Sequence, residues 1–275
     1  MSDPAFDLDA YCRRIGFGGD RSATLETLRA VHLLHPLAIP FENLDVILRR
    51  GVQLDAASLQ DKLIRRGRGG YCFAHNMLMS LALRALGFNV TYLTGRVRYG
   101  VPDGVATSLT HMLLKVDVEG VAYIVDVGFG GNTMTGPLRL DLTAEQATPH
   151  GPFRLTPSGG GYLSEARIRD AWTRLYAFTL EPQHLPDIEL GNWYMATHPK
   201  SRFSEELVAA RATPRGRLAL SNNQLAIHRL NATSERRVLQ TESELRDALT
   251  GLFGLTLPDD PDLSPALTKT LVGAV

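Results

Sequence analysis

A glycine-rich segment that ends in a cysteine constrains the fold more than any other part of the chain. Between Arg66 and Cys72 it holds three glycines and two arginines, and it runs into residues 77–86, whose apolar side chains recur at helical spacing. Gly87 follows, where a left-handed residue readily ends a helix. Cys72 is therefore expected in the first turn, where free N–H groups, the helix dipole and nearby arginines favour a thiolate. The alternative is a buried cysteine that packs as a small apolar side chain.

Length and charge narrow the classes of protein that the chain could represent. Its 275 residues leave room for two domains, or for one domain with an appendage. The 29 basic and 29 acidic side chains cancel, so no overall field attracts nucleic acid or an anionic membrane. No apolar run approaches the roughly 18 residues of a membrane span, and the chain does not open with a secretory leader. We expect a cytoplasmic protein without nucleic-acid or membrane partners; its oligomeric state is left open.

The cysteine count argues against a disulfide framework and against a metal centre. The two cysteines, Cys12 and Cys72, fall in different sequence contexts. A site made of Cys72, His75 and His111 would lack the second pair of ligands that zinc usually has. We therefore expect no metal.

The first third of the sequence reads as a helical bundle. Residues 7–15 predict a short helix, and a second follows Ser22, until Pro36 and Pro40 interrupt its pattern. Residues 57–65 predict another short helix before the glycine-rich segment.

The pattern then changes to β-structure and later becomes mixed. A strand is expected over residues 90–100, and further short strands suggest a barrel or a strongly curved sheet. After residue 191 we expect a mixture of helix and strand, which makes the fold α+β. The further strands are expected at residues 111–118, 121–127, 136–140, 153–156, 174–180 and within 217–229, and the later helices at 193–198, ending at Pro199, and 243–253.

One hairpin register predicts a pair of polar side chains on a shared face. If the hairpin turns on Glu119 and Gly120, the same register places His111 opposite Gly128. Asp126 lies two residues from Gly128 and so shares its face, roughly 7 Å from His111 at the backbone. The opposite face of the hairpin is apolar throughout and belongs in a core.

A cysteine at a helix start, with a histidine oriented by an aspartate, is typical of covalent acyl chemistry. The imidazole takes the thiol proton, the carboxylate stabilises the imidazolium, and the thiolate attacks an acyl carbon. We assign these roles to Cys72, His111 and Asp126. His75, one helical turn from Cys72, is a rival base, although no carboxylate is placed to orient it.

Several blocks of the sequence resemble the arylamine N-acetyltransferases. One departure from the family is Ala74, where relatives commonly carry Glu or Gln; it puts the local support of the first helical turn in question. The resembling blocks occur in the family's order and span nearly the whole chain, at residues 40–45, 66–76, 110–112, 126–131 and 197–203.

The resemblance implies three parts and a two-step reaction. A helical bundle over residues 1–88 would carry the nucleophile, a β-barrel over 89–190 would carry the histidine and aspartate, and 191–275 would form an α/β lid. The core would resemble that of cysteine proteases. In the implied ping-pong reaction, acetyl-CoA acetylates the cysteine, and an arylamine, arylhydrazine or arylhydroxylamine then takes the acetyl group, in keeping with xenobiotic metabolism.

Two further parts of the site are expected. Aromatic residues would line the substrate pocket, and backbone N–H groups of a glycine turn would approach the phosphates of CoA. Two alternatives remain open: a papain-like or transglutaminase-like cysteine hydrolase, and a binding module without catalysis. The implied substrate residues are Phe41, Tyr71, Phe129 and Phe203, and the implied CoA residues are Gly128, Gly130 and Gly131.

Overall fold

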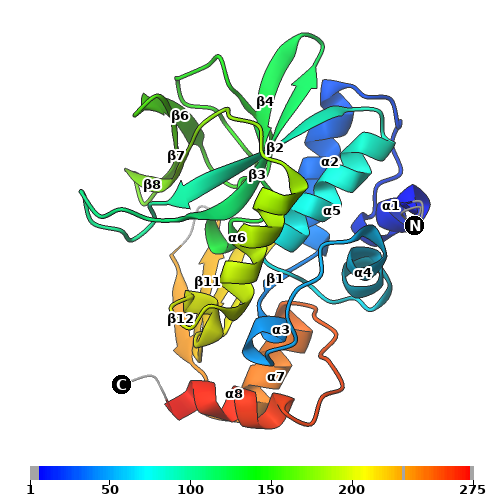
Figure 1. The fold of residues 1–275 in the computed structure, drawn as a ribbon. Helices are drawn as coiled ribbons and strands as arrows, with labels where there is room; N and C mark the ends of the chain where they lie inside the picture. The colour runs from blue at the N-terminus through cyan, green and yellow to red at the C-terminus, as the bar shows by residue number, and fades with distance from the viewer. Residues whose placement is uncertain (1–5, 231–232, 273–275) are drawn as a thin grey trace.

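The chain folds into a helical part, a barrel-like sheet and a second sheet with its own helices (Figure 1). The computed structural model describes residues 6–230 and 233–272. The first five residues, on which the expectation of no leader depends, lie outside these ranges. Within them, no helix is both long enough and apolar enough to cross a membrane. The mixture of helix and sheet agrees with the predicted fold class.

Two helices open the described chain, and a polar residue caps each of them. α1 (Leu8–Ile15) follows Asp7, whose side chain accepts a hydrogen bond from the first turn, and ends at Gly16 with φ of 72°. α2 (Leu25–Ala38) follows Thr24, which caps it in the same way. The prediction of a helix ending at residue 15 is confirmed.

The end of α2 corrects one prediction. Pro36 was expected to interrupt the helix, but it lies inside α2. So close to the end of a helix, a proline removes a single hydrogen bond and can be tolerated. The helix instead stops before Pro40, because the residue preceding a proline avoids helical angles; Ile39 is extended, with φ of −111° and ψ of 111°.

Short elements connect α2 to the helix that begins at Cys72. The predicted helix at 57–65 is present as two segments, α-helical and then π-helical. The predicted stop at Gly87 is also present, with φ of 88°. The elements are β1 (Phe41–Glu42), α3 (Leu44–Ile47), α4 (Ala56–Leu59), η1 (Gln60–Arg65) and α5 (Cys72–Ala85).

Seven strands form a nearly closed barrel in the order β5-β4-β3-β2-β8-β7-β6. Gln146 joins its two edges: the backbone pairs with Phe153 of β6, and the side-chain amide exchanges two hydrogen bonds with the backbone of Arg139 in β5. The sequence did not predict β7. The strands are β2 (Asn89–Val97), β3 (Leu109–Val118), β4 (Val121–Val125), β5 (Leu138–Arg139), β6 (Phe153–Ser158), β7 (Gly161–Ile168) and β8 (Ala171–Phe178).

The β3–β4 hairpin has the predicted register. Val118 pairs with Val121 across the turn at Glu119 and Gly120, which have φ of 53° and 79°. These positive angles are those of a tight turn that matches the twist of the strands. The ladder ends at Val125, so the chain has left the sheet when it reaches Asp126.

The C-terminal third forms the second sheet, in the order β1-β9-β10-β11-β12. β1 comes from the N-terminal part of the chain and pairs antiparallel with β9, with Phe41 opposite Ala210. A helix was expected over residues 193–198, but α6 begins earlier, at Leu185, and ends at Thr197. β9, β12 and α8 were not predicted. The elements are α6 (Leu185–Thr197), η3 (Arg202–Ser204), β9 (Val208–Thr213), β10 (Gly216–Ser221), β11 (Gln224–Arg229), β12 (Glu235–Val238), α7 (Glu242–Asp247), η4 (Ala248–Leu252) and α8 (Leu263–Val272); a short 3-10 helix, η2 (Gly130–Asn132), lies between β4 and β5.

The main hydrophobic core lies between the N-terminal helices and one face of the barrel. Leu78 on α5 packs in the same cluster as Leu28 on α2 and Val116 on β3, and all three are fully buried. Burying a side chain of this size contributes about 1.5–3 kcal/mol. The apolar face of the hairpin therefore fixes α5, and with it Cys72, against the barrel.

Candidate functional site

Cys72 is the first residue of α5 and lies at the meeting point of helix and barrel. Tyr71 before it is extended, so the helix starts at the cysteine itself. Its sulfur lies 3.7 Å from the carbonyl oxygen of Thr110, next to His111 in β3. The glycine turn before the cysteine packs closely on the segment that precedes β1: a Cβ on Gly69 would lie 2.1 Å from the carbonyl oxygen of Pro40.

The two arginines of the glycine segment do not act as expected. Arg68 was expected to add positive charge near the sulfur, but it is buried and its Nη2 bonds the carboxylates of Glu42 and Asp45, at 3.1 and 2.8 Å. Arg66 is exposed and pairs with Asp61. Their charges are matched by carboxylates, so neither arginine places an unpaired positive charge beside the sulfur.

His111 and Asp126 form a buried pair, as the hairpin register predicted. His111 Nε2 lies 2.7 Å from Asp126 Oδ2, and both side chains are almost fully inaccessible. Nε2 therefore carries a proton that it donates to the carboxylate, and Nδ1 is the nitrogen that does not contact Asp126.

The contact shifts the pKa of both groups. Burial alone would lower the pKa of His111, but Asp126, together with the Cys72 sulfur, raises it to about 10. Burial alone would raise the pKa of Asp126, but the attraction of His111 outweighs it and lowers that pKa. An imidazole with a raised pKa is a strong acceptor for a proton from a neighbouring acid.

Neutral groups hold Asp126 in place. Asn76 on α5 donates to Oδ1 at 3.0 Å, and the backbone N–H of Gly128 donates to the same oxygen at 2.9 Å. Thr133 and His32 bond its backbone carbonyl, at 3.1 and 3.3 Å. Asp126 is therefore fixed although it lies beyond the end of β4.

Aromatic rings enclose the imidazole. The ring of Tyr176 in β8 lies 4.6 Å from that of His111, centre to centre, and the ring of Phe129 lies 5.0 Å from it, edge-on. Tyr176 is completely buried, and burial raises the pKa of its hydroxyl well above the usual value. These rings shield the histidine pair from water on the barrel side.

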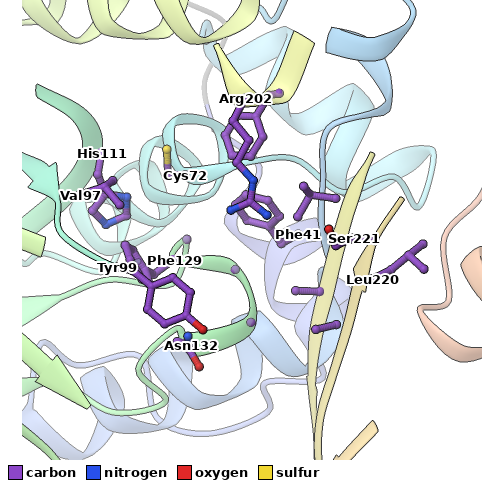
Figure 2. Close-up of a pocket in the computed structure, with 18 of the residues that line it drawn as sticks. Phe41, Cys72, Val97, Tyr99, His111, Phe129, Asn132, Arg202, Leu220 and Ser221 are labelled. Atoms are coloured by element: carbon purple, nitrogen blue, oxygen red, sulfur yellow. The ribbon is translucent and has the colours of Figure 1, made fainter. Parts of the chain in front are cut away.

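A cavity of about 780 Å³ opens onto the cysteine and the histidine. Figure 2 shows Cys72 and His111 at one end of this space, with Phe129 and Tyr99 on the barrel side and Leu220 across from them on the second sheet. The cavity therefore lies between the barrel and the C-terminal sheet.

Most of the predicted binding residues line this cavity, and one does not. Phe41, Phe129 and Phe203 all contribute to the wall. Tyr71 was expected there, but it lies behind the wall: its ring packs against Phe203 and its hydroxyl donates to the backbone carbonyl of Asn192 at 3.1 Å. The extended backbone before the helix turns this side chain into the core. The predicted glycines, also in the wall, are Gly128, Gly130 and Gly131.

The rival base, His75, points away from the sulfur. Tyr11, His35 and His75 form a buried chain in which the hydroxyl lies 2.8 Å from His35 Nδ1, and His35 Nε2 lies 2.9 Å from His75 Nδ1. His75 Nε2 bonds the carbonyl oxygen of Pro40 at 3.1 Å. Its ring also stacks on Phe41, at 6° between the planes. His75 thus supports the cavity wall, and both of its nitrogens are already engaged.

Sequence reasoning missed several residues of the site. Asn76 stood in a motif without an assigned role, and nothing local to it indicated a contact with Asp126. Tyr176 reaches His111 from a strand far along the chain. Basic side chains also belong to the lining of the cavity: Lys200, Arg202, Arg236 and Arg237. Within the described ranges, no cluster of three or more His, Cys, Asp or Glu side chains could hold a metal.

The fold built around this cavity is that of the N-acetyltransferases, and the family model of that description matches residues 24–261. The arylamine N-acetyltransferase of Mycolicibacterium smegmatis is 42% identical over 259 residues, which cover 93% of this chain and 94% of the relative. The solved structure of the Mycobacterium marinum arylamine N-acetyltransferase aligns with a TM-score of 0.93 at 38% identity, over 96% of this chain and 100% of that chain. The same enzyme in complex with CoA gives a TM-score of 0.92 at 38% identity, over 96% and 99%. The chain belongs to the arylamine N-acetyltransferase family and is an acyltransferase.

Proposed function

We propose that the protein moves the acetyl group of acetyl-CoA to the nitrogen of arylamines, arylhydrazines or arylhydroxylamines through an acetyl-Cys72 intermediate. One observation carries the proposal: Cys72 starts a helix and opens onto the same cavity as His111, whose other side is bonded to Asp126. The CoA bound to the related Mycobacterium marinum enzyme supports CoA as the carrier of the acetyl group.

The first half-reaction starts with the proton of the Cys72 thiol on Nδ1 of His111, where the raised pKa of the imidazole holds it. Asp126 stabilises the imidazolium that forms, and the thiolate attacks the thioester carbonyl carbon of acetyl-CoA. A tetrahedral intermediate collapses, the bond to the CoA sulfur breaks, and the imidazolium returns its proton to that sulfur. Free CoA leaves, and Cys72 carries the acetyl group.

The second half-reaction passes the acetyl group to the amine. The amine nitrogen attacks the acetyl carbon, and His111 takes the proton that this nitrogen loses. The bond to the Cys72 sulfur then breaks, and the sulfur recovers the proton. Because the imidazole acts in both halves, an orientation that keeps Nδ1 toward the cysteine serves both.

The cavity wall fits both substrates of this scheme. Its volume lies in the usual range for small-molecule pockets, and rings such as Phe41, Phe129 and Phe203 suit a flat aromatic amine. We assign the phosphates of CoA to the backbone of the glycines at 128, 130 and 131, and to basic residues such as Arg236 across the cavity.

Intact-mass measurement after incubation with acetyl-CoA, in the absence of amine, tests the proposal. We expect one added acetyl group in the wild type and in Cys12→Ser, whose cysteine is buried in α1, and none in Cys72→Ser. Addition of an arylamine should remove the adduct. Absence of the adduct, or release of peptide fragments or ammonia without a CoA ester, would contradict acetyl transfer and favour a hydrolase.

A further inference from the structure

Asn76 connects three segments that have to be aligned at the site. It lies four residues after Cys72, one turn along α5, and is completely buried. Its Nδ2 donates to the backbone carbonyl of Met112 in β3 at 2.7 Å and to Oδ1 of Asp126 at 3.0 Å. Its Oδ1 accepts from the backbone N–H of Val127 at 3.1 Å. Two acceptors on one side and a donor on the other fix which way the amide faces.

These contacts leave the aspartate a single free oxygen. Oδ1 of Asp126 is occupied by Asn76 and by the N–H of Gly128. Oδ2 is then the oxygen available to His111, which it contacts at 2.7 Å. In the part of the chain that the structure describes, His111 is the one charged partner of this carboxylate. Neutral donors therefore determine the direction in which the buried charge points.

We propose that Asn76 is a positioning residue for the acyl-transfer reaction. It turns Asp126 so that Oδ2 faces His111. Because it stands on the same helix as the nucleophile, it also keeps the imidazole aligned with Cys72. The proposal rests on the proposed function of these three residues, and it adds a fourth that touches neither substrate nor the reacting atoms.

A purely structural role is the competing explanation. The bonds to Met112 and Val127 alone could stabilise the packing of α5 on the barrel. Loss of such a role would lower stability but would leave the reactivity of the Cys72 sulfur unchanged at each pH. Ser80, one turn further along α5, offers a matched control: it is completely buried, its Oγ donates to the carbonyl of Met77 at 2.8 Å, and its hydrogen bonds do not involve Asp126.

The test measures the rate of alkylation of Cys72 by iodoacetamide between pH 5 and 9, in the wild type, Asn76→Ala, Asn76→Asp and Ser80→Ala. This readout needs no acetyl-CoA, so it is independent of the acyl donor. In Asn76→Ala the Asp126 carboxylate loses a donor and its fixed orientation. In Asn76→Asp, a carboxylate replaces the amide that donates to Oδ1 of Asp126 at 3.0 Å. Two carboxylates so close share a proton.

We expect both Asn76 variants to react at pH 6 at least about tenfold more slowly than the wild type, with rates that rise only near the pH of an ordinary thiol. Ser80→Ala should follow the wild type, and circular dichroism should show all four proteins folded. If Asn76→Ala does not fold, the isosteric Asn76→Asp decides the question. A folded Asn76 variant with a wild-type profile overturns the proposal. A wild type that reacts like a free thiol overturns the proposed function, and this inference with it.

Discussion

Gly128 lies directly against the start of the helix that carries Cys72. A Cβ on Gly128 would be 2.8 Å from the Cα of Cys72 and 3.0 Å from its carbonyl oxygen. Cβ atoms do not come this close to backbone, so only glycine lets the loop after β4 reach the cysteine. This loop also carries Asp126, and the contact sets the distance between the carboxylate and Cys72.

Gly128→Ala should therefore displace the loop or the first turn of α5. A displacement of about 1 Å at a reacting centre costs on the order of a hundredfold in rate, and we expect acetylation of Cys72 to slow by about that factor. Time-resolved intact-mass measurement with acetyl-CoA would report it. Gly136→Ala is the control, because its Cβ would meet other atoms only at 3.9 Å. Equal rates in the two variants would show that the close contact is not needed.

Asp126→Asn should keep the fold and lose most of the activity. The asparagine is nearly the same size, but it removes the anion that stabilises the His111 imidazolium, so the acetylation rate should fall by on the order of 10³ to 10⁴. Single-turnover acetylation followed by mass spectrometry measures this directly, with circular dichroism to verify folding. A rate near that of the wild type would remove Asp126 from the mechanism.

Stability at alkaline pH should depend on His111. Its pKa rises from 6.5 in the unfolded chain to about 10 in the folded protein. The protonated imidazole therefore stabilises the fold fully below pH 6.5, and this contribution is lost as the pH rises through about 10. The free energy of unfolding, measured by urea denaturation, should fall across this range by at most about 1.4 kcal/mol per pH unit. The His111→Gln variant should show a flatter curve, and parallel curves would contradict the assignment.

Stability at acid pH should depend on the buried chain that ends at His75. Burial lowers the pKa of His75 to about 4, below its unfolded value of 6.5. A neutral His75 thus contributes stability in full above pH 6.5, and the contribution is lost as the pH falls through about 4. His75→Gln keeps a donor for the Pro40 carbonyl but does not titrate. We expect its unfolding free energy to decline less between pH 6.5 and 4 than that of the wild type; an equal decline would assign the acid sensitivity to other groups.

Local patterns in the sequence predicted the hairpin and the pairing of His111 with Asp126, but not the contacts that hold Asp126 beyond the end of the strand. Alternation along both strands and the Glu119-Gly120 turn fixed a register, and the register carried His111 and Asp126 to the same face. The structure has this register as far as Val125. Beyond it the strand ends, and contacts from other elements, which no local pattern contains, bring Asp126 to His111.

Other features depend on contacts between segments far apart in the chain, or on helix-start residues that the prediction did not use. The start of α6 was signalled by Pro186 and Asp187, residues typical of a first helical turn, and Asp187 accepts a hydrogen bond from the N–H of His184. The place of Tyr71 behind the cavity wall depends on Asn192, far along the chain. The charge balance around Arg68 depends on carboxylates more than twenty residues before it. Sequence spacing alone does not encode such contacts.

The pairing of β1 with β9 separates the order of synthesis from the order of assembly. Phe41 leaves the ribosome early, yet the strand that pairs with it, through Ala210, is made long afterwards. Until then the nascent chain can pack its first helices and bridge Phe41 to Gly70, but it lacks β9 and has no second sheet opposite Cys72. The closed cavity is therefore completed late in translation, and a polypeptide released before β9 would carry Cys72 without the wall that faces it.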